Sequence, residues 1–415
     1  MKITPIPSGT KDILPSEAIE QRWLESRIRG VFDSFGYQEV ITPTLEMESA
    51  MDVAGEKRFK RSFRLFDERG EVLIMRPEMT TPIARLVSTK MADREPPFRL
   101  SYFANSYRPT TPQRGRQSEF YQAGLELIGL ESPAVDAEVL AVLCQALTAC
   151  GLEEFSVGLG ESSFFTALLE SAGVNGENRE AIFDALAERD LVKLSSVVAG
   201  LDISDDDREA ILGVTRLRGG SEVLIEAHDY VRGPAMEEAL KRLARTYYLV
   251  SRYGFAGRIL FDLGILSDFD YYTGIVFEVL SGELGFPVGG GGRYNGLLAR
   301  YGRPEPAVGF AISLDRLHIA ITGQGGVSLP DSPGIALVGG FDLALDLAMK
   351  LREKGVNVMA LPEDMDKDAA VTAATSAGIG RVVMPDGDQF NLFDTCGGKG
   401  TKAKIEDIID TMAVK

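Results

Sequence analysis

The sequence predicts an α+β fold, with a large core on a mixed, mainly antiparallel sheet flanked by helices, followed by a small α/β domain. Two hairpin patterns predict the antiparallel strands, because β-branched and aromatic runs are separated there by polar turns. A stretch rich in Ala, Leu and Glu predicts a helical insertion over about residues 162–245. Strand and helix patterns alternate near the C-terminus. We expect a core over residues 1–325 and a second domain over residues 333–415.

The 415-residue chain is long enough for more than one domain, and its composition is that of a folded protein. A formal net charge of -17 disfavours a broad contact with nucleic acid, because phosphate binding depends on Lys and Arg displacing counterions. Three cysteines, Cys144, Cys150 and Cys396, form no even disulfide framework, which fits a reducing compartment, and Cys144 and Cys150 fit an apolar helix. With only two histidines, we expect no metal site.

The N-terminus lacks the continuous apolar segment of a signal peptide. No stretch approaches the roughly 18 apolar residues that a membrane span needs. We therefore expect a cytoplasmic protein that does not contact a membrane.

The N-terminal region predicts a helix followed by a short strand. Ser16 is a suitable N-cap, and the helical spacing continues to about Phe35, where Gly36 ends the helix. The strand that follows ends at Pro43. A long helix followed by a strand at a domain edge often supports self-association, although a simple core helix explains this segment equally well.

The next segments predict two antiparallel hairpins. The first turns at Glu68–Gly70 and ends at Glu78 before a helix. The second has a polar loop that carries Arg108, Arg114 and Arg116. Arginines on rigid strands can make bidentate contacts with phosphate or carboxylate, but single arginines are more often solvated surface residues.

A set of acidic, amide and aromatic residues falls at strand ends or alternates along predicted strands, where its members can share one face of a sheet. Carboxylates on such a face suit a ligand ammonium, and tyrosines offer a ring to stack and a hydroxyl to hydrogen-bond. The combination suits an amino acid whose side chain is aromatic and polar. In the alternative interpretation, the acidic and amide members merely pair with neighbouring arginines. The set comprises Glu78, Gln122, Glu126, Tyr271, Tyr272 and Tyr294.

Four consecutive glycines, Gly289–Gly292, precede Arg293 and Tyr294. Glycine lets the backbone come close to a ligand or to another strand. The run lacks the GxxxxGK[ST] spacing of a phosphate loop, and no GxGxxG follows a predicted strand. We therefore expect a tight turn or a flexible edge at this position.

Several linked motifs resemble the class II aminoacyl-tRNA synthetases of the histidyl type. YRPTTPQRGRQSEFYQAGLELIG is similar to their second motif, GGGGRYNGLLARYG with PAVGFAISLDRL to their third-motif region, and DYYTGIVFE to their histidine-binding motif. The likeness covers about residues 5–320 in the family's order. It implies a class II synthetase-like core whose histidine-binding residues are Glu78, Thr80, Arg108, Gln122, Glu126, Tyr271, Tyr272 and Tyr294. Within this set, Glu126 and Gln122 are expected to contact the imidazole or ammonium, and Arg108 the carboxylate.

This family contains active histidyl-tRNA synthetases and noncatalytic paralogues that are regulatory subunits of ATP phosphoribosyltransferase. The synthetases carry an arginine before the paired tyrosines that assists adenylate formation, whereas this chain has Ser267 followed by Asp268. Attack on the α-phosphate builds negative charge that a guanidinium stabilises, and loss of one such donor commonly lowers the rate on the order of 100-fold or more. Efficient histidine activation is therefore not expected.

The nucleotide half of the synthetase pattern departs at further positions. Thr110 stands where the synthetases have a glutamate, and Ser118 stands where they have an arginine. Arg108 and Arg316 still match the two class-defining arginines. Arg116 and Arg316 are accordingly candidate contacts for a nucleotide or another anion.

The resemblance thus implies a histidine-binding regulatory subunit with no reaction of its own, which acts with a short-form catalytic ATP phosphoribosyltransferase subunit in histidine biosynthesis and its feedback control. It implies a homodimer within a hetero-oligomer, with no cofactor. The C-terminal domain resembles a reduced anticodon-binding domain, but its acidic residues outnumber its basic ones, so no tRNA contact is expected. An active histidyl-tRNA synthetase is the alternative, and a synthetase-like protein with another partner is a third hypothesis.

Overall fold

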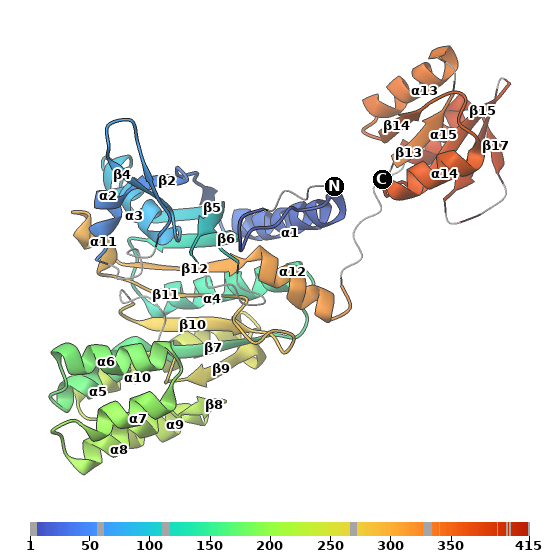
Figure 1. The fold of residues 1–415 in the computed structure, drawn as a ribbon. Coiled ribbons are helices and arrows are strands. Elements are labelled where there is room, and N and C mark those ends of the chain that lie inside the picture. Colours follow the sequence, from blue (N-terminus) through green and yellow to red (C-terminus); the bar gives the residue numbers. More distant parts are fainter. Residues whose placement is uncertain are drawn as a thin grey trace. The chain divides into compact units, whose positions relative to one another are not determined.

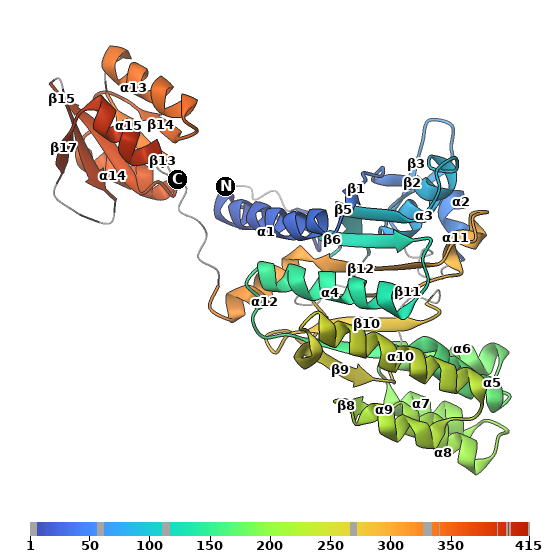
Figure 2. The same ribbon diagram turned by 180° about the vertical axis from the view of Figure 1, so that it is seen from behind.

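The computed structural model forms two compact units, Met1–Val327, the core unit, and Ser328–Lys415, the C-terminal unit. Figures 1 and 2 show the ribbon from opposite sides. The structure describes residues 6–55, 62–109, 117–265, 272–326, 334–339, 341–387, 389–395, 397 and 400–413.

The core unit is built on a large mixed sheet. In sheet order, its strands among the described residues are β1 (Gln38–Glu39), β5 (Phe98–Tyr107), β6 (Glu119–Ile128), β12 (Ala307–Ser313), β11 (Gly289–Arg293), β10 (Ile275–Leu280), β7 (Ser156–Glu161), β9 (Ile259–Asp262) and β8 (Arg218–Gly219). The pairs β1/β5 and β7/β9 are parallel, and the other neighbours are antiparallel. The predicted fold class, a mixed and mainly antiparallel sheet, is confirmed.

Helices cover one face of this sheet, and Figure 2 shows α4 and α10 lying across it. These helices are α1 (Pro15–Ser34), α4 (Pro133–Ala149), α10 (Pro234–Arg252) and α12 (Leu314–Gly323). Alternate residues of the strands, such as Leu125 and Phe277, point into an apolar core with Phe32 and Leu140 from the helices. This alternation follows from the two-residue period of a strand, which leaves the intervening residues for the opposite face.

The first helix begins two residues earlier than its sequence predicts. Pro15 is its first residue and Leu14 its N-cap, and no side chain caps the helix, so the predicted cap at Ser16 is wrong. Proline favours the first helical position because its missing N–H would have no helical partner there. The helix ends at Ser34, and Gly36 adopts φ 77°, a conformation that glycine reaches without strain.

The chain between β7 and β9 is mainly helical, and we call α5 to α10 the helical segment. Its further helices are α5 (Ser162–Ser171), α6 (Gly176–Ala187), α7 (Leu191–Ala199), α8 (Asp205–Val214) and α9 (Val223–Glu226). Buried residues of these helices, including Phe164, Ile182 and Leu194, belong to the same apolar cluster as the sheet. The helical segment is therefore packed continuously with the core.

A small antiparallel sheet lies at one end of the core unit (Figure 1). Its strands, in order, are β2 (Leu45–Met47), β4 (Val72–Met75) and β3 (Arg64–Phe66), so the first predicted hairpin is confirmed. The helices beside it are α2 (Glu48–Asp52), α3 (Thr80–Thr89) and α11 (Leu297–Arg300). Ile74 and Ile83 from this group pack with Leu100 and Tyr102 of β5 in a second apolar cluster. This cluster covers part of the large sheet's other face.

The glycine run is an interior strand, so the expected turn or flexible edge is wrong. Strand β11 pairs with β10 on one side and with β12 on the other. A Cβ on Gly291 would lie 2.0 Å from the carbonyl oxygen of Gly309, so only glycine lets these strands approach so closely. The glycines therefore serve close strand packing at the centre of the sheet.

The C-terminal unit is a separate α/β sheet in the order β14-β13-β15-β16-β17. Its elements are β13 (Gly334–Val338), α13 (Phe341–Glu353), β14 (Asn357–Leu361), α14 (Lys367–Ser376), β15 (Arg381–Asp386), β16 (Gln389–Asp394), β17 (Thr401–Ala403) and α15 (Ile405–Ala413). The parallel β14, β13 and β15 follow the alternating strand and helix pattern of the sequence. The elements after β15 were not predicted, because QFNLFD and TKA carry many polar residues for strands.

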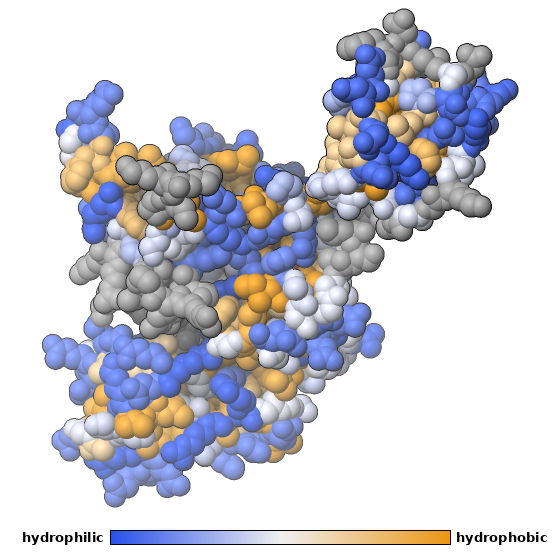
Figure 3. Space-filling view, turned by 45° about the vertical axis from the view of Figure 1, so that its right-hand side comes forward, coloured by the Kyte–Doolittle hydropathy of each residue, from blue (hydrophilic) through white to orange (hydrophobic). Residues whose placement is uncertain are grey.

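Surface and buried polar features fit the composition. Hydrophilic residues, in blue, cover much of the visible face of each unit in Figure 3. Cys144 and Cys150 are free and buried, as the helical pattern predicts, whereas Cys396 lies outside the described residues.

In the described ranges, no helix is long and apolar enough to cross a bilayer. In the same ranges, no group of three or more His, Cys, Asp or Glu side chains is arranged to hold a metal ion.

Candidate functional site

The candidate site lies on the face of the large sheet opposite α4 and α10. Strand pairing places Glu126 of β6 opposite Gly309 of β12, and Gly309 opposite Gly292 of β11. A Cβ on Gly309 would lie 1.8 Å from Oε2 of Glu126. The glycines thus form a floor without side chains, on which the Glu126 carboxyl group lies.

Glu126 is the centre of a buried hydrogen-bond group. Thr80 at the start of α3 donates its hydroxyl to Oε1 of Glu126 at 2.9 Å, and the Tyr294 hydroxyl donates to Oε2. Glu126 is 1% exposed and Tyr294 2% exposed. The structure therefore joins three predicted site residues from distant parts of the chain, and the alternative in which Glu126 merely pairs with arginines is wrong.

The environment of Glu126 favours its protonated form. Burial raises the pKa of Glu126 to about 8, and the hydrogen bonds from Tyr294 and Thr80 only partly oppose that rise. The neighbouring carboxylate of Glu78 raises the pKa further. The buried position of Glu126 thus favours the protonated carboxyl group near neutral pH.

Glu78 orients the start of helix α3. Its Oε2 accepts a hydrogen bond from the Thr80 amide at 2.6 Å, and its Oε1 accepts one from the Thr81 amide at 2.8 Å. These amides have no helical partner, so the carboxylate caps the helix and holds Thr80 toward Glu126. Burial nevertheless raises the pKa of Glu78.

Arg108 supplies positive charge beside these carboxyl groups. Its charge opposes the burial-driven rise in the pKa of Glu78. Nε of Arg108 donates to the Pro77 carbonyl at 2.8 Å, and its guanidinium carbon lies 5.2 Å from the centroid of the Phe120 ring. The Arg108 guanidinium is therefore held against the carbonyl of Pro77, the residue before Glu78.

Gln122 lies on the same face of β6 as Glu126, four residues before it. Its Oε1 accepts a hydrogen bond from the Ser106 hydroxyl at 2.8 Å, so Gln122 does not merely pair with an arginine. Since Gln122, Gly124 and Glu126 alternate along one strand, they face the same side of the sheet. The side-chain amide of Gln122 also carries two N–H groups, which can donate hydrogen bonds.

Of the paired tyrosines, Tyr272 lies beside the site. It is half-buried and packs against the second apolar cluster. A Cβ on Gly292 would lie 2.7 Å from Cδ1 of Tyr272, so the ring covers that glycine. Tyr271 lies outside the described residues, as do Ser267 and Asp268.

Tyr102 was not predicted as a site residue, yet the structure places it in this group. It lies opposite Gly124 across the β5/β6 pair, and a Cβ on Gly124 would lie 2.3 Å from the Tyr102 hydroxyl. Burial, followed by the charges of Glu126 and Glu78, raises the pKa of Tyr102 well above its usual value. The alternation of Leu100, Tyr102 and Ala104 along the predicted hairpin is the signal that identifies this face.

Of the two candidate nucleotide contacts, Arg316 lies within the described residues and Arg116 does not. Arg316, in the first turn of α12, donates to the Pro287 carbonyl at 2.7 Å. Its guanidinium carbon lies 4.7 Å from the centroid of the Phe286 ring, in the loop before β11. Arg116 lies outside the described residues, together with Thr110. Ser118 is described, and its amide donates to the Gly9 carbonyl at 2.7 Å.

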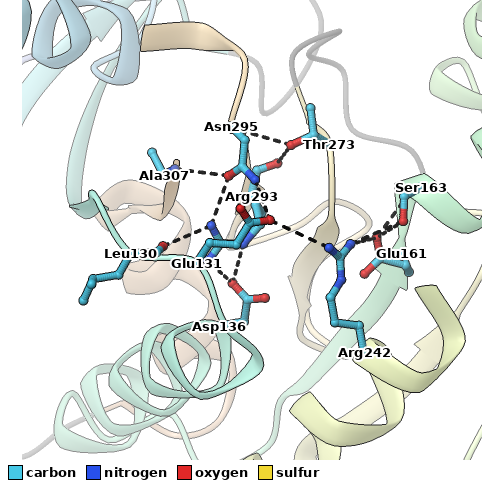
Figure 4. A network of polar contacts seen from close by, with 10 residues as sticks. All are labelled: Leu130, Glu131, Asp136, Glu161, Ser163, Arg242, Thr273, Arg293, Asn295 and Ala307. Carbon is cyan, nitrogen blue, oxygen red and sulfur yellow. Dashed lines mark hydrogen bonds and ion pairs between the residues drawn. The ribbon is translucent and has the colours of Figure 1, made fainter. Parts of the chain in front are cut away.

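A buried ion pair anchors the strand that leads to Tyr294 (Figure 4). Arg293, 1% exposed, donates to Oδ1 of Asp136 through Nε at 2.8 Å and through Nη2 at 2.5 Å. Its Nη1 donates to Oδ1 of Asn295 at 3.0 Å. Burial raises the pKa of Asp136, while the charge of Arg293 opposes this rise. Tyr294 thus lies between Arg293 and Asn295, which are hydrogen-bonded to each other.

The chain is similar to known proteins over most of its length. The family model described as histidyl-tRNA synthetase matches residues 9–317. A protein of Moorella thermoacetica named ATP phosphoribosyltransferase regulatory subunit is 41% identical over 379 residues, 90% of this chain and 96% of that protein. A protein of the same name from Desulforamulus reducens is 37% identical, covering 91% of this chain and 95% of its relative.

Solved structures agree with these relatives. A Bacillus halodurans protein described as an ATP phosphoribosyltransferase regulatory subunit/histidyl-tRNA synthetase is 31% identical, with a TM-score of 0.80 over 92% of this chain and 97% of that chain. A histidyl-tRNA synthetase of Nostoc shares only 22% identity, with a TM-score of 0.82 over 99% of each chain, and supports the fold alone. The resemblance drawn from the sequence motifs is confirmed. The chain belongs to the family of ATP phosphoribosyltransferase regulatory subunits, which share the class II fold of histidyl-tRNA synthetase.

Proposed function

We propose that the chain is a noncatalytic, histidine-binding regulatory subunit of ATP phosphoribosyltransferase, required for the first step of histidine biosynthesis and its feedback control. The observation that carries histidine binding is the buried Glu126 carboxyl group, held by Thr80 and Tyr294 on a glycine floor. Glu78 and Arg108 stand beside it. Two carboxyl groups and one guanidinium suit an amino acid that carries a carboxylate and two basic nitrogen groups.

In this proposal Glu126 and Gln122 contact the imidazole or the ammonium of histidine, and Arg108 contacts its carboxylate. Tyr272, whose ring covers Gly292, provides an aromatic surface next to the floor. A bound cation stabilises the ionised form of Glu126, so binding favours loss of the proton that burial retains in the free protein. Tyr271 completes the set by resemblance to the family motif.

The absence of catalysis in this proposal is supported by the residues at the nucleotide half. Ser267 replaces the arginine that stabilises charge on the α-phosphate in the synthetases, and Thr110 and Ser118 replace two further polar contacts. These features disfavour the alternative of an active histidyl-tRNA synthetase.

The proposed partner is a separate, short-form catalytic subunit of ATP phosphoribosyltransferase. Feedback requires histidine to bind one state of the complex more tightly than another, because a ligand shifts an equilibrium only by that difference. The experiment is to co-purify the two chains, assay the transferase with and without this subunit, and titrate histidine into each. Activation by this subunit and histidine inhibition that depends on it support the proposal, and histidine binding without any effect on the transferase contradicts it.

We further propose that two copies of the chain associate through the core unit. The outer face of the small sheet carries apolar residues in register, with Leu45 opposite Met75, and with Met47 and Leu65 both opposite Leu73. Leu45 is 43% exposed and Leu65 41% exposed. An apolar face of this kind supports an interface, and the first helix and strand are expected from the family to belong to it.

Leu65→Asp is expected to convert a dimer into a monomer at micromolar concentration. A two-fold interface uses each patch twice, so the substitution places two charges in the contact. Sedimentation velocity measures the result, and Ile225→Asp is the matched control because Ile225 is an exposed apolar residue of the helical segment. A wild-type monomer, or equal dissociation of both variants, would remove the small sheet from the interface.

A further inference from the structure

A polar network connects the candidate histidine site to the two ends of the helical segment (Figure 4). Its first part joins the residues next to Tyr272 and Tyr294. The Thr273 amide donates to the Arg293 carbonyl at 2.7 Å, and the Asn295 amide donates to the Thr273 hydroxyl at 3.0 Å. These two hydrogen bonds tie Thr273, next to Tyr272, to Arg293 and Asn295 on either side of Tyr294, and we call this group the Thr273–Asn295 clamp.

The second part of the network leads from the clamp to Glu131, in the segment before α4. Nδ2 of Asn295 donates to Oε1 of Glu131 at 2.9 Å. The same carboxylate oxygen lies 3.9 Å from Nη1 of Arg242. Glu131 is thus the point where the site's clamp meets a residue of α10.

Arg242 holds the beginning and the end of the helical segment together. Its Nη2 donates to Oε1 of Glu161, the last residue of β7, at 3.1 Å, and lies 3.4 Å from the Ser163 hydroxyl in the first turn of α5. Arg242 itself belongs to α10, the last helix of the segment. One guanidinium therefore links β7, α5, α10 and the clamp.

The contacts of Arg242 leave one oxygen of Glu161 without a partner in the described residues. The Glu161 side chain is 0% exposed, and within the described residues its Oε2 has no hydrogen-bond partner. An unpaired buried carboxylate oxygen is unfavourable, and guanidinium groups prefer to bind both oxygens of a carboxylate. If Glu131 withdraws, Arg242 can turn both amino groups toward Glu161. Pairing of Arg242 with both oxygens of Glu161 is thus the alternative to the present pairing, which Glu161 shares with Glu131.

We propose that Arg242 is the positioning residue that transmits occupancy of the candidate histidine site to helices α5 and α10. The inference rests on the proposed histidine binding and adds the route by which binding reaches another surface of the subunit. Movement of the Thr273–Asn295 clamp changes the distance between Glu131 and Arg242, and Arg242 then shifts between its two pairings. The helical segment changes position or stability because its entry and exit share that guanidinium.

Hydrogen–deuterium exchange of the full chain, with and without saturating histidine, tests the route. In the wild-type protein, histidine is expected to change the opening equilibrium of amides in α5 and α10 by about 5-fold or more. Glu131→Ala removes the link while leaving the Arg242–Glu161 contact, and Glu131 is exposed enough, at 50%, for the variant to fold. Exchange in α3 and around Tyr294 should still respond to histidine, whereas α5 and α10 should no longer do so.

Arg242→Gln is expected to have the same effect, and Lys241→Gln is the matched control. Lys241 is the neighbouring residue of α10 and forms an exposed pair with Glu237, so its loss should leave the histidine response intact. A response of α5 and α10 that survives in both Glu131→Ala and Arg242→Gln overturns the route. Calorimetry on the same samples separates the route from the proposed histidine binding. If the wild-type protein binds histidine but exchange in α5 and α10 does not change, only the route is overturned. An absence of histidine binding overturns the proposed function and the route together.

Discussion

Glu126→Ala is expected to weaken histidine binding by roughly 100-fold, because truncating one partner of a buried charge-assisted contact commonly costs about 3 kcal/mol. The reason lies in the site's construction. Thr80 and Tyr294 both point their hydroxyl groups at this carboxyl group, so its removal leaves them without an acceptor and removes the charge that a bound cation requires. Isothermal titration calorimetry at pH 7 measures the change.

Glu126→Gln is the matched variant for this experiment. Glutamine resembles the protonated carboxylic acid that burial favours in the free protein, so the fold and its thermal unfolding should change little. It cannot ionise, and histidine affinity should therefore fall toward that of the alanine variant. Wild-type affinity in Glu126→Ala would place the histidine site elsewhere, whereas wild-type affinity in Glu126→Gln alone would show that binding needs the hydrogen bonds and not the charge.

Asp136→Ala is expected to lower the free energy of unfolding of the core unit by about 3–5 kcal/mol. The substitution leaves the Arg293 guanidinium buried at 1% exposure without its carboxylate. Desolvation of an unpaired charge is more costly than loss of the pair's attraction alone. Urea unfolding followed by circular dichroism measures the effect, and the change in midpoint should exceed that of ordinary surface substitutions.

An exposed ion pair in the same unit provides the control. Asp205, whose side chain is 100% exposed, pairs with Arg208 at 2.6 Å, and Asp205→Ala should change the free energy of unfolding by less than about 1 kcal/mol. Replacing both buried partners, in Asp136→Ala with Arg293→Met, should recover part of the loss because no charge is left unpaired. Equal changes in the free energy of unfolding in Asp136→Ala and Asp205→Ala would mean that the buried Asp136–Arg293 pair does not stabilise strand β11.

Local patterns in the sequence predict the elements of the fold well where one physical cause dominates. The long hairpin of β5 and β6 follows from the alternation of its side chains, and helix α4 follows from the helical apolar spacing between about Pro133 and Cys150. The predicted turn or flexible edge at the glycine run is wrong, because β11 pairs on both sides and a side chain at Gly291 would clash with the Gly309 carbonyl. This close approach of β11 and β12 exists only in the folded sheet, so the local sequence cannot predict it.

The candidate site was predictable to the extent that its residues lie in family motifs or alternate on one strand. Glu126 and Gln122 share a face of β6, and the structure brings Thr80 and Tyr294 to Glu126 as the resemblance implies. Tyr102 was missed because its role depends on its pairing with Gly124 across the hairpin. The Arg242–Glu161 contact was missed as well, since it joins residues 81 positions apart through the packing of a helix against a strand end.

Histidine-dependent exchange between ATP and pyrophosphate tests the central claim most directly. The account predicts that the purified chain binds histidine in calorimetry yet catalyses no exchange above a protein-free control, because Ser267 cannot supply the positive charge that adenylate formation requires. Ser267→Arg, which restores that charge, provides a check on the same assay. Exchange by the wild-type chain at the rate of an authentic histidyl-tRNA synthetase would contradict the account and establish an active synthetase in its place.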